Sequence, residues 1–139
     1  MKVLAMTTRS APKRPPIHMI DTEADTLTDL ALARQERSPE VSALLLEEIN
    51  RAKIHPANKI PADVVTMHSR VEFVDEASGA SRTVELVYPA DADIDAGRIS
   101  IMTPVGAGLI GLREGQSILW PDRDGQQRRL SIVKVERRG

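Results

Sequence analysis

Residues 99–118 read Ile99-Ser-Ile-Met-Thr-Pro-Val-Gly-Ala-Gly-Leu-Ile-Gly-Leu-Arg-Glu-Gly-Gln-Ser-Ile118, which predicts a short strand, a short apolar helix and a second strand. The helix is expected to start at the Thr-Pro pair. The Thr103 hydroxyl can accept the first free backbone N–H groups, and Pro104 at the first helical position loses no hydrogen bond. Gly111 and Gly115 lie at a spacing suited to the helix end and to a tight turn into the second strand.

The segments on both sides of this stretch have the alternation and the turn residues of β-strands. Before it, we expect strands at Val64–Met67, Arg70–Val74 and Thr83–Tyr88, with a turn over residues 76–80 and an acidic loop over residues 91–97. After it, we expect strands near Ser117–Trp120 and Arg128–Glu136. The predicted fold class is therefore α+β, with a small antiparallel sheet that holds one short helix.

Two helices are expected before the sheet. Thr22-x-x-Asp25 resembles a capping box and starts a helix near residues 22–35, and Ser38-Pro39-Glu40 starts a second helix that continues to about residue 54. Their apolar stripes and short connection predict a helical hairpin with arms of roughly 20–25 Å. We expect a basic tail at residues 1–16, the hairpin at 17–55, a linker with two prolines at 56–62 and the sheet domain at 63–139.

The composition favours a folded protein that is soluble and cytoplasmic. Hydrophobic residues make up 41% and charged residues 28% of the 139 residues, and no apolar run approaches the length of a membrane span. The chain has no cysteine, which excludes disulfides and thiolate zinc sites. His18, His55 and His68 lie far apart in the sequence without metal-ligand spacing, so we interpret them as surface or packing residues and expect no metal and no cofactor.

Positive charge is concentrated in the first 16 residues, although the whole chain has a net charge of −1. Residues 1–16 contain four basic and no acidic residues, while residues 17–60 and 61–139 each carry a net negative charge. This distribution lacks the broad positive face of proteins that grip nucleic acid directly. It favours a disordered tail over the alternative of a nucleic-acid-binding arm.

From about Asp63 to Val135 the sequence resembles the C-terminal domain of the GreA/GreB transcription elongation factors. Thr103-Pro104 stands where that family shows Ser-Pro, and the acidic loop Asp91–Gly97 precedes it as in the family. Asp63-Val-Val-Thr-Met-His-Ser-Arg-Val71, Leu86-Val-Tyr-Pro89 and Pro104-Val-Gly-Ala resemble the branch called regulator of nucleoside diphosphate kinase. The resemblance implies the topology of FK506-binding proteins for the sheet domain and a shortened coiled-coil hairpin before it.

The resemblance also implies a partner, bacterial RNA polymerase. In the family the globular domain docks on the rim of the secondary channel and the hairpin points inward, so nucleic acid is reached only through the polymerase complex. The residues that match the docking loop are Met102, Thr103 and Pro104, and Asp93 in the acidic loop is a further candidate.

The hairpin tip departs from the pattern of the cleavage factors. In Gre factors an acidic pair at the tip helps to hold a catalytic metal ion in the polymerase and promotes cleavage of backtracked RNA. Here the tip is Arg34-Gln-Glu-Arg-Ser-Pro-Glu40, in which Glu36 and Glu40 lie beside Arg34 and Arg37. A second metal ion needs carboxylates that are not neutralised. We therefore expect a regulator without catalytic residues that competes with Gre factors, and cleavage stimulation is the alternative.

Two further functions follow from the resemblance and are disfavoured by the residues. A prolyl isomerase needs an aromatic-lined pocket, and Phe73, Tyr88 and Trp120 are the only aromatic residues of the chain. A direct effect on nucleoside diphosphate kinase is not supported by the residues, because the sequence contains no phosphate-binding glycine loop and no kinase signature. An effect on that kinase would act through its expression or through a protein contact that the sequence does not reveal.

Overall fold

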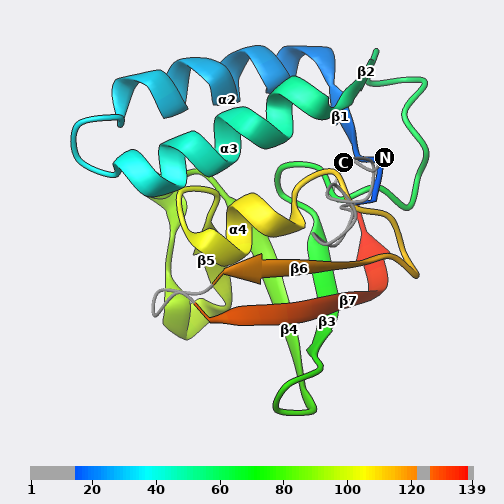
Figure 1. Ribbon diagram of the computed structural model, residues 1–139. Coiled ribbons are helices and arrows are strands. Elements are labelled where there is room, and N and C mark those ends of the chain that lie inside the picture. The colour runs from blue at the N-terminus through cyan, green and yellow to red at the C-terminus, as the bar shows by residue number, and fades with distance from the viewer. Residues whose placement is uncertain (1–14, 122–125, 138–139) are drawn as a thin grey trace, which may run out of the picture.

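The structure is a computed structural model that describes residues 15–121 and 126–137 (Figure 1). Most of the expected basic tail, and residues 122–125 between the last two expected strands, lie outside the described residues. In chain order the elements are β1 (His18–Ile20), α2 (Asp21–Ala33), α3 (Pro39–Arg51), β2 (Lys53–His55), β3 (Arg70–Asp75), β4 (Ala80–Val87), β5 (Arg98–Ser100), α4 (Pro104–Leu109), β6 (Ser117–Pro121) and β7 (Gln127–Glu136). Two 3₁₀ turns, Pro89–Asp91 and Ile94–Ala96, lie between β4 and β5.

The main sheet has five strands in the order β5-β4-β3-β7-β6. Three of its four pairings are antiparallel, but β5 joins β4 in parallel at one edge. The expectation of a wholly antiparallel sheet is therefore wrong at this edge, because residues 88–97 return the chain to the level of Glu85 before β5 pairs with β4. The fold remains α+β, with α2, α3 and α4 as the α-helices of the described residues.

The strand expected at Val64–Met67 is not formed. Only an isolated bridge joins Val64 to Arg113, and the backbone of Val65 bonds to the chain just after α4. The backbone bonds to the end of β4 come from the next two residues, His68 and Ser69. Val64, Val65 and Met67 are all buried, so apolar side chains fill the core from an irregular segment. A short run of consecutive apolar residues is also typical of a buried strand, which explains why the sequence predicted one here.

The three helices lie on one side of the sheet, with α4 between the sheet and the pair formed by α2 and α3 (Figure 1). One cluster of buried side chains connects all these layers. It includes Leu27 and Ala31 of α2, Leu45 of α3, Leu109 of α4, and Val71, Phe73, Leu86 and Ile132 of the sheet. The two N-terminal helices therefore share one hydrophobic core with the sheet.

The start of α2 differs from the expected capping box at Thr22-x-x-Asp25. Strand β1 runs directly into the helix, so Ile20 is the N-cap residue and no side chain caps the helix. Thr22 lies inside the first turn, where its N–H donates to Asp21 Oδ1 at 2.7 Å. At α3 the expected N-cap position, Ser38, is correct, although its side chain makes no capping hydrogen bond.

A second, two-stranded sheet closes the base of α2 and α3. Strand β1 pairs with β2 in parallel, with His18 opposite Lys53 and Ile20 opposite His55. The sequence predicted an apolar entry at Ile17–Ile20 and a helix that continues to about residue 54, whereas α3 ends at Arg51. Strands of three residues leave no periodic signal, which explains why this pairing was missed.

Among the helices that the structure describes, none combines the length and apolar character needed to cross a membrane.

Candidate functional site

The turn between β5 and α4 is held rigid by hydrogen bonds of its own side chains. Thr103 Oγ1 accepts the N–H of Gly106 at 3.1 Å and donates to the Ser100 carbonyl at 2.7 Å. The N–H of Met102 donates to Ser100 Oγ at 2.9 Å. The helix start predicted at Thr103-Pro104 is therefore confirmed, with the threonine as the cap and the proline in the first turn.

This turn lies close against the strand before it because residue 106 is glycine. A Cβ atom at Gly106 would come within 2.3 Å of the Ser100 carbonyl oxygen. Met102, Thr103 and Pro104 remain half-buried, so the turn presents a fixed edge to solvent. Three of the four residues predicted to contact a partner thus lie together on one short, ordered segment.

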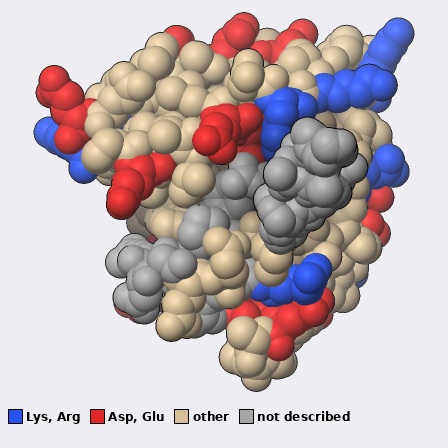
Figure 2. Space-filling model, viewed as in Figure 1, with Lys and Arg blue, Asp and Glu red and all other residues tan. Residues whose placement is uncertain are grey.

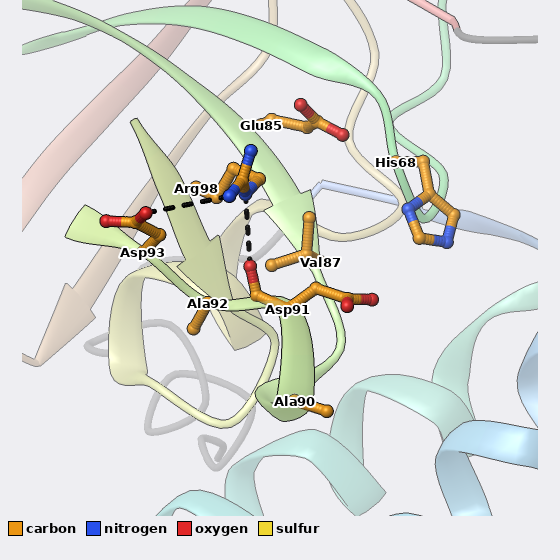
Figure 3. Close-up of a pocket in the computed structure, with 8 residues that line it drawn as sticks. All are labelled: His68, Glu85, Val87, Ala90, Asp91, Ala92, Asp93 and Arg98. Atoms are coloured by element: carbon orange, nitrogen blue, oxygen red, sulfur yellow. Dashed lines mark hydrogen bonds and ion pairs between the residues drawn. The ribbon is translucent and has the colours of Figure 1, made fainter. Parts of the chain in front are cut away.

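The fourth candidate, Asp93, organises the acidic loop. Its Oδ1 accepts the N–H of Ala96 at 3.3 Å, and its Oδ2 lies 3.6 Å from Nη2 of Arg98. The Arg98 guanidinium also donates from Nε to the Asp91 carbonyl at 3.1 Å (Figure 3). About half of the Asp93 side chain is exposed, so the carboxylate both shapes the loop and faces solvent.

Two adjoining hollows connect the acidic loop with the Thr103 turn. The first, an open hollow of about 400 Å³, is polar and includes His68, Glu85, Asp91 and Asp93 in its lining (Figure 3). The second, of about 370 Å³, has a more apolar lining. It includes Phe73, Val84, Ile94, Ile99, Thr103 and Val105. Ala92 and Arg98 line both hollows, so the fold brings Asp93 and Thr103 to one continuous region of the surface.

A polar group beside the first hollow was missed by the sequence analysis. Glu23 of α2 accepts the N–H of Met67 at 3.1 Å, and burial raises the pKa of its carboxyl. His68 has a left-handed backbone with φ of 71°, and its ring meets the Tyr88 ring edge-on at 5.7 Å. Burial and, to a smaller extent, the charge of Glu23 raise the pKa of Tyr88. The hydrogen bond between Glu23 and Met67 joins residues that are 44 positions apart, so no local sequence pattern could predict it.

The connection between α2 and α3 places its charged residues in solvent. Gln35, Glu36, Arg37 and Glu40 are exposed, and neither glutamate lines either hollow. Each helix has 13 residues, which corresponds to a length of about 20 Å. Within residues 15–121 and 126–137, no group of three or more His, Cys, Asp or Glu side chains could hold a metal ion.

Charges of both signs are mixed over the described part of the face seen in Figure 2. The basic side chains visible there form separate groups, the largest toward the β1–β2 end of the helices, and acidic side chains lie between them. The described residues on this face thus form no continuous positive surface of the kind that binds nucleic acid through its phosphates.

Residues 60–137 match the model of a protein family described as "Transcription elongation factor, GreA/GreB, C-term". This match spans more than half of the chain and all five strands of the main sheet. The chain belongs to the GreA/GreB family. The family predicted from the Thr103-Pro104 stretch and the acidic loop is thereby confirmed.

Relatives of two kinds are found within the family. The regulator of nucleoside diphosphate kinase from Escherichia coli K12 is 36% identical over 123 residues, which cover 88% of this chain and 90% of that protein. The transcription elongation factor GreA of Azorhizobium caulinodans is 38% identical over 76 residues, which cover 55% of this chain and only 48% of that protein. Of these two relatives, the regulator is similar along most of both chains, whereas the GreA match covers about half of each.

A solved structure agrees with this assignment. The prokaryotic transcription elongation factor GreA/GreB from Nitrosomonas europaea is 36% identical, covers 89% of this chain and 100% of its own, and superposes with a TM-score of 0.69. The likeness includes the N-terminal helices as well as the sheet, since it extends beyond residues 60–137.

Proposed function

We propose that this protein is a non-catalytic transcription regulator that binds bacterial RNA polymerase at the rim of its secondary channel. In this proposal the partner meets the turn formed by Met102, Thr103 and Pro104. The acidic loop with Asp93 contributes beside it. Nucleic acid is then reached only through the polymerase.

The observation that carries the proposal is the rigid Thr103 turn beside the apolar hollow. The hydroxyl of Thr103 both donates and accepts a hydrogen bond within the turn. The turn is therefore already ordered, and little conformational entropy is lost when a partner covers it. Ile94, which lines the same hollow, is 80% exposed, and apolar groups exposed on a monomer mark surfaces that partners cover. Membership of the GreA/GreB family supports RNA polymerase as this partner.

Two features of the helical tip support a role without cleavage stimulation. Helices of 13 residues extend about 20 Å, which is short for reaching a buried active centre. Glu36 and Glu40 are exposed on a tip that also carries Arg34 and Arg37, whereas a magnesium ion needs a closely placed pair of oxygen ligands that keep their charge.

Binding is tested by fluorescence titration of the labelled protein with core RNA polymerase. The double variant Thr103→Ala with Pro104→Ala should weaken binding at least tenfold, a change of about 1.4 kcal/mol. The matched control is Glu36→Ala with Glu40→Ala, which should bind like the parent protein. Our assignment of the surface is wrong if the control loses binding and the turn variant keeps it, and the proposal fails if the folded parent protein does not bind at micromolar concentration.

The absence of cleavage stimulation is tested on a stalled, backtracked transcription complex. We expect no shortened RNA when this protein is added alone. Added in excess over a Gre factor, it should slow the cleavage that the Gre factor produces, because both would need the same rim. Metal-dependent cleavage that disappears in Glu36→Ala would contradict the first expectation, and unchanged Gre-dependent cleavage at saturation would contradict the second.

We further propose that residues 63–139 share the topology of FK506-binding proteins without their isomerase activity. The apolar hollow beside Thr103 contains one aromatic residue, Phe73, in its lining, whereas desolvation of a prolyl bond requires several. An effect on nucleoside diphosphate kinase, the activity in the name of the Escherichia coli relative, would then be indirect and act through transcription.

A further inference from the structure

The base of the helical pair is closed by a very small parallel sheet. Strand β1 leads directly into α2, and β2 follows α3 after a single residue, Ala52. Each strand has only three residues. Lys53 and Ile54 of β2 are exposed, so few apolar contacts hold this strand in place. Segments with short pairing and little burial open at low free-energy cost.

Two imidazoles face each other across this sheet. Nδ1 of His18 lies 2.9 Å from Nε2 of His55, and the ring centroids are 5.0 Å apart. A hydrogen bond between two ring nitrogens needs one N–H donor and one unprotonated acceptor. The contact therefore persists with no added proton or with one, and it is lost when both rings are protonated, because no acceptor then remains.

The charges around the pair oppose the second proton. Burial lowers the pKa of His18, and the positive charges of His55, Arg113 and Lys53 lower it further, while Asp63 acts in the opposite direction. Asp63 is itself bound to Arg113 Nε at 2.9 Å. Arg51, at the end of α3, adds another positive charge near the β1–β2 sheet, although its guanidinium is paired with the buried Glu48 carboxylate at 2.7 Å. Two charged imidazoles would thus repel each other in a region already rich in cations.

The same pair lies at the joint between the helices and the sheet domain. The backbone N–H of His18 donates to the Gly111 carbonyl at 3.1 Å, and the N–H of Lys53 donates to the Ile17 carbonyl at 2.9 Å. Beyond β2, the chain is held by a small separate cluster of Ile20, Ile60 and Val64. Release of β2 would therefore free residues 52–59, while Leu27 and Leu45 keep the helices on the main core.

We propose that the His18–His55 pair is a proton-sensitive latch on this joint. With at most one added proton it holds β2 against β1. When both imidazoles are protonated, repulsion releases β2 and the connection between the helical pair and the sheet domain loosens. The latch is a property of the fold and does not depend on binding to RNA polymerase.

The sign of the pH dependence follows from the lowered pKa of His18. A base whose pKa is lower in the folded state stabilises that state above its unfolded pKa, and this stabilisation is lost as pH falls through the folded value. An unperturbed histidine has a pKa of about 6.5, and that of His18 lies below it, so the latch is closed above about pH 7 and opens as the pH falls below that range. Between the pKa of the released imidazole and the lower pKa of His18 in the closed latch, each pH unit changes the opening equilibrium about tenfold.

The test is amide hydrogen exchange of the full chain followed by NMR between pH 7.5 and 5.0, corrected for the intrinsic pH dependence of exchange. The reporter is the Lys53 amide, and the Leu86 amide, which donates to the Ser69 carbonyl at 3.0 Å in the main domain, is the internal reference. We expect protection of Lys53 to fall about tenfold relative to Leu86 over this range. Constant relative protection would overturn the proposal.

Two variants separate the latch from a general effect of acid. His55→Gln keeps a hydrogen-bonding side chain that does not titrate, so relative protection of Lys53 should change less than twofold with pH. The control His68→Asn removes the third histidine and should behave like the parent protein. A pH response of His55→Gln equal to that of the parent would refute the latch.

A measurement on the unmodified protein makes the test independent of how the variants fold. The ring ¹⁵N shifts of His18 should report a titration below the usual histidine range, because burial and the nearby positive charges lower its pKa. A titration of His18 near the ordinary histidine pKa of about 6.5 would rule out the latch.

Discussion

At the scale of single residues, Gly111 allows the N-terminal segment to lie against the turn after α4. Its φ is 86°, and a Cβ atom there would come within 2.9 Å of Ile17 Cβ and 3.0 Å of the His18 carbonyl. Both backbone conformation and space therefore require glycine at this position. The spacing of Gly111 in the sequence indicated a helix end, but the contact with Ile17 arises only in the folded chain.

We predict that Gly111→Ala destabilises the fold by more than Gly79→Ala. Gly79 has a φ of 75° and open space around the position of an added Cβ. Its substitution therefore costs only the free energy of holding an alanine in a left-handed conformation, about 1–2 kcal/mol. Gly111→Ala adds the clash with Ile17. Urea unfolding of both variants measures the difference, and equal midpoints would show that the close approach is relieved without cost.

Glu23 allows a prediction about pH. Its pKa is raised by burial, so its contribution to stability is fully present below the unfolded pKa and is lost as pH rises through the folded value. Glu23→Gln keeps an oxygen that can accept the Met67 N–H and removes the buried charge. The variant should therefore be more stable than the parent at pH 7 and equal to it near pH 4. Thermal unfolding at both pH values is the measurement, and a variant that is less stable at pH 7 would contradict the prediction.

At the scale of elements, α4 shows how much a short helix depends on its first residue. The helix has six residues, and Thr103 both caps its N-terminus and ties it to β5 through the Ser100 carbonyl. A helix this short has little stability of its own, so the cap and tertiary packing maintain it.

Thr103→Ala should lower the free energy of unfolding by about 1 kcal/mol, and Thr103→Ser should stay within a few tenths of the parent value. The serine hydroxyl can make both hydrogen bonds, so the pair of variants isolates the cap from the loss of a methyl group. Chemical denaturation gives both values. If the two variants were equally destabilised, the methyl contact rather than the hydroxyl would maintain the turn.

At the scale of the whole molecule, the helices and the sheet share one buried cluster. Leu45 of α3 is fully buried in the same cluster as Phe73 of β3 and Leu109 of α4. Proteins whose layers share a core generally unfold in one cooperative step. The division into a hairpin at 17–55 and a sheet domain at 63–139 remains a prediction about sequence segments, and we expect no separate folding of the two.

Leu45→Ala should destabilise the helices and the sheet together, by about 2–5 kcal/mol. Hydrogen exchange can follow α2 and β3 separately in the same sample. Coincident loss of protection in both elements is the expected result. An early loss confined to α2 and α3, with β3 unchanged, would show that the helices form an independent unit.

Local residue types predict those parts of the protein whose causes lie within a few residues. The start of α4 at Thr103-Pro104 depends on one hydroxyl and one ring, and the turn between β3 and β4 depends on Gly79, so both could be predicted from local residue types. The same stretches identify the family, because they carry its motifs. The contact surface formed by Met102, Thr103 and Pro104 stays a prediction, and local residue types account only for the ordered turn that these neighbours form.

Features that join distant residues without a periodic pattern arise only in the folded chain. The His18–His55 pair spans 37 positions and the bond of Glu23 to Met67 spans 44. Both depend on how α2 and α3 pack on the core, and no local propensity encodes that packing. The hollow that brings Thr103 beside the acidic loop is also a tertiary feature, because residues 88–97 must return the chain along β4 before β5 can pair with it in parallel.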